Sequence, residues 1–183
     1  MVTQKRKRQR HTVNVINFFA GPGAGKSTTA SGLFCLMKQN GDNVELVTEF
    51  AKDLTWEGNL NCLKDQLFVS ATQNHRLFRL IDEVDWVVTD SPLLLSLLYK
   101  KSNYYDKFDE FMLSVFNSYN NFNFFINRTK DYVQSGRTQT LHEAQQLDSK
   151  IKLLLKNLKI PYTSINGNKS ASKVAFEIIK HWH

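Results

Sequence analysis

Apolar residues follow two different periods along the chain after residue 12, and these periods predict alternating strands and helices. Short apolar runs rich in β-formers are typical of buried strands, and they occur at 13–19, 43–50, 85–90, 122–127 and 162–166. Helical spacing of apolar residues lies between them, over 26–40, about 60–82, 91–99, 108–119, 140–158 and 170–183. Because parallel neighbours need crossover connections, this order predicts an α/β fold with a parallel five-stranded sheet and helices on both faces.

Residues typical of helix ends support several of these boundaries. Gly41 is expected to stop the first helix. Ser91 and Pro92 are expected to cap and begin the helix after the third strand, and Thr140 with Glu143 has the pattern of a capping box. Core-facing stripes are expected in the two middle helices, at Leu63, Leu67, Ala71, Leu77, Phe78 and Ile81, and at Phe108, Phe111, Met112, Val115, Phe116 and Tyr119.

Composition adds a basic N-terminal arm to this scheme. The chain has 183 residues, and its net charge of +7 includes five cationic side chains within residues 1–11. We expect residues 1–11 to be a disordered arm, although such an arm also attracts nucleic acid or other polyanions. Residues 12–183 are expected to form one domain.

Two further features bear on the compartment. No 18-residue apolar run and no signal-peptide pattern is present, so we expect a soluble, cytoplasmic protein without a membrane partner. The only cysteines, Cys35 and Cys62, fall in helical patterns and are interpreted as reduced packing residues.

The segment "AGPGAGKST" lies between the first strand and the first helix, and it predicts a phosphate-binding loop. Glycines let consecutive N–H groups turn toward phosphate oxygens, and the next helix presents its positive N-terminus to the same anion. Lys26 would reach the outer phosphates and Ser27 would bind magnesium. An alanine, Ala20, stands where this pattern usually begins with glycine. The expected nucleotide-binding residues here are Gly21, Pro22, Gly23, Ala24, Gly25, Lys26, Ser27 and Thr28.

The order of several motifs resembles the nucleoside and nucleotide kinase branch of the P-loop proteins, and within it the ribosylnicotinamide-kinase-like group labelled as AAA-type ATPase domains. The resembling segments are "AGPGAGKST", "TEFAKD", Gln73, "VVTDSP", "NRTKDYVQSGR" and "ING". This resemblance implies a P-loop NTPase fold, ATP and Mg²⁺ as cofactors, and a second substrate beside the phosphate-binding loop.

Residues after the second and third strands take candidate roles from the resemblance. Glu49 would accept the proton of the substrate hydroxyl, and Asp90 would hold magnesium or the substrate hydroxyl. Lys52 replaces an arginine of the family pattern and precedes Asp53, and both would contact substrate. Gln73 would read a base or base-like ring. The alternatives are a surface carboxylate at Glu49, a helix cap at Asp90 and an exposed amide at Gln73.

Residues after the fourth and fifth strands would lie on the nucleotide side of the site. The resemblance makes 128–140 a short lid that brings Arg128 and Arg137 to the transferring phosphates, although an ordinary solvated loop has a similar composition. Asn166 and Gly167 resemble the loop on the adenine side.

Three functions fit these features. The first is an ATP- and Mg²⁺-dependent kinase that phosphorylates a hydroxyl of a nucleoside-like or nucleotide-like acceptor. The second is a kinase acting on a hydroxyl within nucleic acid, such as a hydroxymethylated pyrimidine of the 5-hydroxymethyluracil type, with the basic arm on the backbone. The third is a nucleotide-switched binding ATPase. The family resemblance favours the first over the second, because the basic arm can also be a solvated terminus. The compact chain argues against the third, because it leaves little room for an effector region.

Overall fold

A parallel sheet of five strands forms the centre of the computed structural model, which describes residues 13–129, 131–133 and 140–182. The strands are β1 (Asn14–Phe19), β2 (Val44–Val47), β3 (Trp86–Thr89), β4 (Asn120–Asn127) and β5 (Thr163–Asn166). Their order in the sheet is β2-β3-β1-β4-β5, so β1 lies between β3 and β4. The expected α/β class and the five parallel strands are confirmed.

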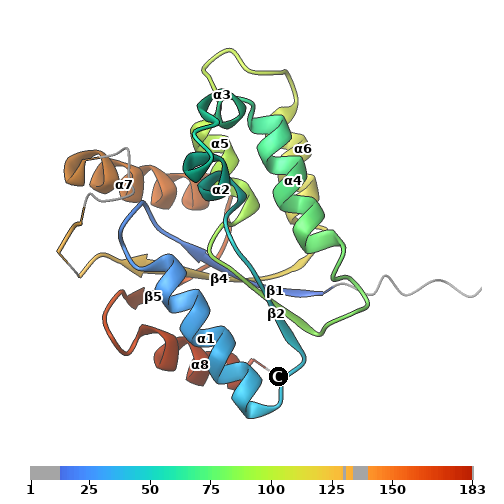
Figure 1. Cartoon of the computed structure of the whole chain (residues 1–183), viewed down its shortest axis with the longest axis vertical. Helices are drawn as coiled ribbons and strands as arrows, with labels where there is room; N and C mark the ends of the chain where they lie inside the picture. The colour runs from blue at the N-terminus through green and yellow to red at the C-terminus, as the bar shows by residue number, and fades with distance from the viewer. Residues whose placement is uncertain (1–12, 130, 134–139, 183) are drawn as a thin grey trace, which may run out of the picture.

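Both faces of the sheet are covered, as alternating side chains of β1 illustrate. Val15 and Phe19 belong to one apolar core, whereas Ile16 and Phe18 belong to the other. On the second face lie α1 (Lys26–Asn40) and α8 (Ala171–Lys180), side by side in Figure 1. The first face carries α4 (Gln66–Phe78), η1 (Leu93–Leu95), α5 (Ser96–Tyr99), α6 (Phe108–Phe116) and α7 (Leu141–Asn157).

The prediction of a single helix over about 60–82 is wrong. This segment is divided into α3 (Leu60–Leu63) and α4, and a further helix, α2 (Phe50–Trp56), precedes it where the sequence pattern gave none. Asp65 causes the division, because its side chain accepts the Phe68 N–H at 3.2 Å and thereby caps α4. The residues α4 buries are largely polar, and they include Gln66, Ser70 and Gln73. The expected apolar stripe fails because this helix faces a cavity as well as the core.

Smaller expectations are corrected in the same way. Pro92 lies before the first helical residue, and Ser91 makes no side-chain cap, because the chain enters a 3₁₀ turn at Leu93. Phe111 is exposed, whereas Phe108 and Met112 of the same helix are buried. Cys35 is exposed too, so it is not a packing residue. The Gly41 stop and the Thr140–Glu143 capping box are confirmed.

Two remaining expectations concern membrane-spanning helices and the N-terminal arm. In the described ranges, no helix is both long and apolar enough to cross a membrane. The basic arm predicted for residues 1–11 lies outside those ranges.

Candidate phosphate-binding and acceptor site

Every strand of the described sheet ends at a predicted site residue. The glycine-rich segment follows β1, Glu49 lies two residues past β2, and Asp90 follows β3 directly. Arg128 follows β4 and Gly167 follows β5. Because the carboxyl ends of parallel strands share one edge of the sheet, residues far apart in the sequence meet there.

The phosphate-binding loop, residues 20–27, has the backbone shape that its glycines permit. Gly23 and Gly25 have φ angles of 75° and 107°, in the region that side-chain-bearing residues rarely adopt. Gly25 is also the N-cap of α1, so Lys26, Ser27 and Thr28 form the first turn of that helix. Ser27 and Thr28 are exposed. The first N–H groups of α1 have no partner in their own helix and no side-chain cap from Gly25, so an anion beside the loop would be stabilised there.

Lys26 lies folded along the loop that it follows. Its Nζ donates to the carbonyl oxygens of Ala20 at 2.8 Å and Gly21 at 3.3 Å. Burial lowers the pKa of this amine, while the nearby carboxylates of Glu49 and Asp90 partly oppose the shift. The nearby carboxylates compensate the charge of this buried amine only in part. A bound phosphate would supply the rest of the negative charge.

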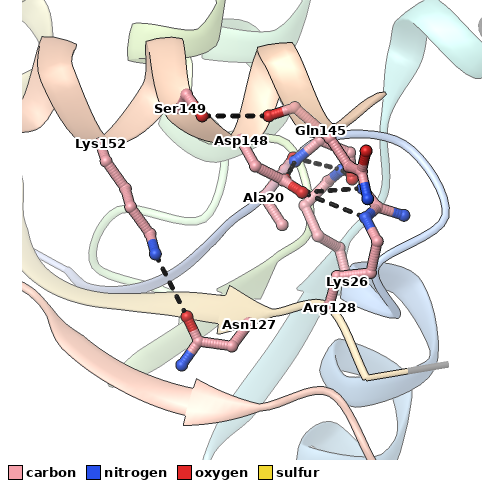
Figure 2. Close-up of polar contacts among 9 residues, drawn as sticks. Ala20, Lys26, Asn127, Arg128, Gln145, Asp148, Ser149 and Lys152 are labelled. Atoms are coloured by element: carbon pink, nitrogen blue, oxygen red, sulfur yellow. Dashed lines mark hydrogen bonds and ion pairs between the residues drawn. The ribbon is translucent and has the colours of Figure 1, made fainter. Parts of the chain in front are cut away.

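Asp148 braces the loop from α7, and sequence reasoning missed it. Its Oδ1 accepts the Gly21 N–H at 2.6 Å, and its Oδ2 accepts the Arg128 Nε–H and Nη2–H at 3.1 and 3.0 Å (Figure 2). The loop and α7 are so close that a Cβ on Gly21 would lie 2.6 Å from the Ala144 carbonyl oxygen. One carboxylate thus fixes both the start of the phosphate-binding loop and the arginine after β4.

Arg128 keeps one donor available above the phosphate-binding loop. Its Nη1 is buried and has no hydrogen-bond partner within the described part of the chain. This nitrogen lies 3.3 Å from where a Cβ of Gly23 would be, and the Tyr132 ring lies over the same glycine. The Arg128 side chain is 10% exposed. A buried cationic donor beside the loop glycines fits an anionic ligand, and the phosphate-binding role expected for Arg128 stays a prediction.

Two carboxylates approach the loop from the neighbouring strands. Asp90 is 3% exposed, and its Oδ1 finds no hydrogen-bond partner among the described residues. Burial raises the pKa of Glu49, and the charge of Lys26 partly offsets the rise. An unpartnered carboxylate oxygen and the exposed Ser27 hydroxyl are hard oxygen donors of the kind magnesium takes, so these residues fit the ion.

A cavity of about 580 Å³ opens from the phosphate-binding loop toward the helices of the first face. Pro22, Gly23, Lys26 and Ser27 line it at the loop, and Glu49 lines it after β2. The other walls come from α2, α3, α4, η1 and α5, and they include Lys52, Trp56, Gln66, Gln73 and Tyr99. Its size is within the range of small-molecule sites.

The other predicted residues are divided between this cavity and its surroundings. Gln73 lines the cavity, but its Oε1 accepts the Phe50 N–H at 2.9 Å and its Nε2 donates to the Thr48 carbonyl, so it ties α4 to α2. Asp53 does not line the cavity and pairs instead with Arg76 at 2.6 Å.

Among the residues assigned to the nucleotide side, Gly167 lies beside the phosphate-binding loop. Asn166 and Gly167 are absent from the cavity lining, and a Cβ on Gly167 would collide with the Ala24 carbonyl oxygen. This contact places the β5 end against the loop. Arg137 lies outside the described residues, as do residues 130 and 134–139 of the expected lid.

The parallel sheet, the glycine loop between β1 and α1, and the lysine of its first helical turn together define a P-loop NTPase. The chain matches the AAA domain family over residues 15–172, and it belongs to that family. Comparison with curated proteins gave no match.

Proposed function

We propose that this P-loop protein is an ATP- and Mg²⁺-dependent kinase that transfers the γ-phosphoryl group to a hydroxyl of a nucleoside-like or nucleotide-like acceptor. The observation that carries the proposal is the shared cavity. Lys26, Ser27 and Glu49 line the same space of about 580 Å³, which extends well beyond the loop that would hold the phosphates. A site that only hydrolysed ATP would need room for a single water molecule there.

In this proposal the acceptor oxygen attacks the γ-phosphorus while the bond from that phosphorus to the β,γ-bridging oxygen breaks, and ADP leaves. The acceptor hydroxyl proton passes to the Glu49 carboxylate. Lys26 and Arg128 stabilise the charge on the transferring phosphoryl group and the departing ADP. The Glu49 carboxylate makes no hydrogen bond to another side chain among the described residues, so none competes with the acceptor hydroxyl.

Ser27 and Asp90 would hold the magnesium ion, which would neutralise phosphate charge when bound. Asp90 is suited to this role because its buried Oδ1 lacks a partner within the described ranges. Burial without a partner is costly for a carboxylate, and a cation removes that cost.

The proposal is tested with γ-³²P-labelled ATP, magnesium and separate pools of nucleosides, nucleotides, plain DNA and hydroxymethylated DNA. We expect label on an organic acceptor in at least one pool. Label found only in inorganic phosphate, at a rate that no pool alters, would contradict a kinase and favour the nucleotide-switched binding ATPase.

The Lys26→Ala variant tests the loop within the same assay. We expect transfer to fall by roughly 100-fold or more, since the lysine stabilises charge that develops on the transferring group. Lys38→Ala is the matched control, because Lys38 lies on the same helix but pairs with Glu45 on the surface. Transfer by Lys26→Ala within about threefold of the wild type, a change worth under about 1 kcal/mol, would contradict the assigned role.

A further inference from the structure

The walls of the acceptor cavity carry an excess of positive charge. Four lysines line it, whereas Glu49 is the one acidic side chain in its described lining. Lys26 belongs to the phosphate-binding loop, and Lys52 lies close enough to Glu49 for its charge to oppose the raised pKa of that carboxyl. Lys64 and Lys101 have no such assignment.

Lys64 and Lys101 also differ from the lysines around them in having no acidic partner. Neither side chain makes an ion pair or a hydrogen bond with any residue that the structure describes, although the Lys64 backbone N–H donates to the Asn61 carbonyl at 3.1 Å. Nearby, Lys100 pairs with Asp109 at 2.5 Å and Lys107 pairs with Glu110 at 2.8 Å. Lys100 and Lys107, which do not line the cavity, are thus paired with carboxylates, whereas the Lys64 and Lys101 side chains have no such partner among the described residues.

These two lysines line the same cavity from separate elements. Lys64 follows α3 directly, and Lys101 lies just past α5. Figure 1 shows α3 at the end of this helix group that is farthest from the sheet. Lys64, as the C-cap of α3, therefore lies toward the outer end of the cavity, and Lys101 lines the same cavity from outside the loop between β1 and α1, where the phosphates of ATP belong.

We propose that the acceptor bears a phosphate group, which Lys64 and Lys101 bind at the outer end of the cavity while its hydroxyl faces Glu49. The acceptor is thus a nucleotide and not a neutral nucleoside. This inference rests on the proposed kinase function. The phosphate has two possible sources, the monoester of a free nucleotide or a phosphodiester of a polynucleotide strand, and both present the same anionic oxygens to lysine.

A binding experiment tests the phosphate requirement without depending on transfer. Calorimetry on the full chain, with magnesium and a non-hydrolysable ATP analogue present, would compare the four deoxynucleosides, their 5′- and 3′-monophosphates and a single-stranded octanucleotide. We expect at least one phosphate-bearing probe to bind roughly tenfold or more tightly than its nucleoside, since charge-assisted hydrogen bonds are the strong ones. Equal binding of nucleosides and monophosphates, or no binding of any phosphate-bearing probe, would overturn the inference.

The Lys64→Gln/Lys101→Gln double variant assigns the effect to these side chains. It should lose most of the preference for the phosphate-bearing probe and keep the affinity for the ATP analogue. Lys38→Gln/Lys107→Gln removes the same charge from surface ion pairs and should leave the preference unchanged. An unchanged preference in the Lys64→Gln/Lys101→Gln variant would show that other residues hold the phosphate.

The binding probes and the label assay together distinguish a free nucleotide from a polynucleotide acceptor. They also distinguish failure of the proposed kinase function from failure of the phosphate requirement. Tighter binding of a monophosphate than of the octanucleotide supports a free nucleotide, and the reverse supports a polynucleotide. If a phosphate-bearing probe binds through Lys64 and Lys101 but no pool accepts label from ATP, the proposed kinase function fails while the anionic site stands. If label passes to nucleosides as readily as to nucleotides, the kinase stands and the phosphate requirement fails.

Discussion

At the scale of single residues, burial shifts the pKa values of two ionisable groups in the site, Lys26 and Glu49, so that their neutral forms are favoured. Desolvation lowers the pKa of Lys26 and raises that of Glu49, and each group is the main opposing charge for the other. Such shifts are common where a group must accept a proton or meet a charge that the substrate supplies. Both groups line the same cavity, so a bound substrate would supply the charge and the hydroxyl proton that these groups need.

The raised pKa of Glu49 predicts a pH dependence of the proposed transfer. Glu49 accepts a proton only when ionised, so turnover should fall as the pH drops through a pKa above 4.5. Glu49→Gln should lower turnover by roughly 10²- to 10⁴-fold, remove this acid limb and leave ATP affinity unchanged. Turnover at saturating substrates across pH 4–9 is the measurement, and an unchanged acid limb in the variant would place the base elsewhere.

The same shift predicts an opposite effect on stability. Because the folded-state pKa of Glu49 lies above its unfolded value, the folded chain binds more protons between those two values, and stability falls as the pH rises through that window. The Glu49→Gln variant has no carboxyl at this position, so its stability does not fall for this reason as the pH rises. It should be more stable than the wild type at pH 7.5 and match it near pH 4, as urea unfolding at both values would measure. A variant less stable at pH 7.5 would contradict the burial argument.

At the scale of secondary structure elements, α7 holds the phosphate-binding loop through one side chain. Asp148→Ala leaves the Arg128 guanidinium buried without its carboxylate, and we expect a loss of roughly 3 kcal/mol in the free energy of unfolding. Arg128→Ala/Asp148→Ala should lose less than the sum of the single changes, by roughly 1–3 kcal/mol. Ser149→Ala is the control, since its hydroxyl bonds only within α7 among the described contacts. Additive losses in urea unfolding would show that the pair is not coupled.

The division between α3 and α4 supports a second prediction at this scale. Asp65 accepts the Phe68 N–H and a hydrogen bond from the Tyr104 hydroxyl, so Asp65→Ala should cost about 1 kcal/mol of unfolding free energy. Asp65→Asn keeps an acceptor at the cap and should cost much less. Equal losses for the two variants in urea unfolding would contradict the capping role.

Elements that depend on local pattern were predictable, and those that depend on distant partners were not. The Gly41 stop, the Thr140 capping box and the glycine loop follow from nearby residues, and the structure has each of them. The break at Asp65 was missed because a helical apolar pattern continues on both sides of it. Asp148 was missed because nothing in its own helix indicates Gly21 or Arg128, which lie 127 and 20 residues away along the chain.

At the scale of the whole molecule, two groups of cationic residues bear on the choice of acceptor. Five of the cationic side chains behind the net charge of +7 belong to residues 1–11, and the cavity lysines Lys52, Lys64 and Lys101 form a second group. The cavity lysines can bind a phosphate of any acceptor that enters. The arm would matter only for a long polyanion, because its charges are spread along a chain end.

Shortening the chain therefore distinguishes a polynucleotide acceptor from a free nucleotide. If the acceptor lies within DNA, removal of residues 2–11 takes away five charges that can neutralise phosphates, and affinity for an oligonucleotide should fall. Each phosphate neutralised on double-stranded DNA contributes about 0.9 to the slope of log affinity against log salt, so the slope should also become shallower. Oligonucleotide affinity over a salt series, for the intact and shortened proteins, is the measurement.

Turnover on a free nucleotide is the internal control for this comparison, because it depends on the cavity and not on the arm. We expect the shortened protein to keep it and the Lys64→Gln/Lys101→Gln variant to lose it. Parallel salt lines with equal oligonucleotide affinity would exclude the arm as a nucleic-acid contact. The charge that selects the acceptor would then lie in the cavity alone, beside the hydroxyl that is to be phosphorylated.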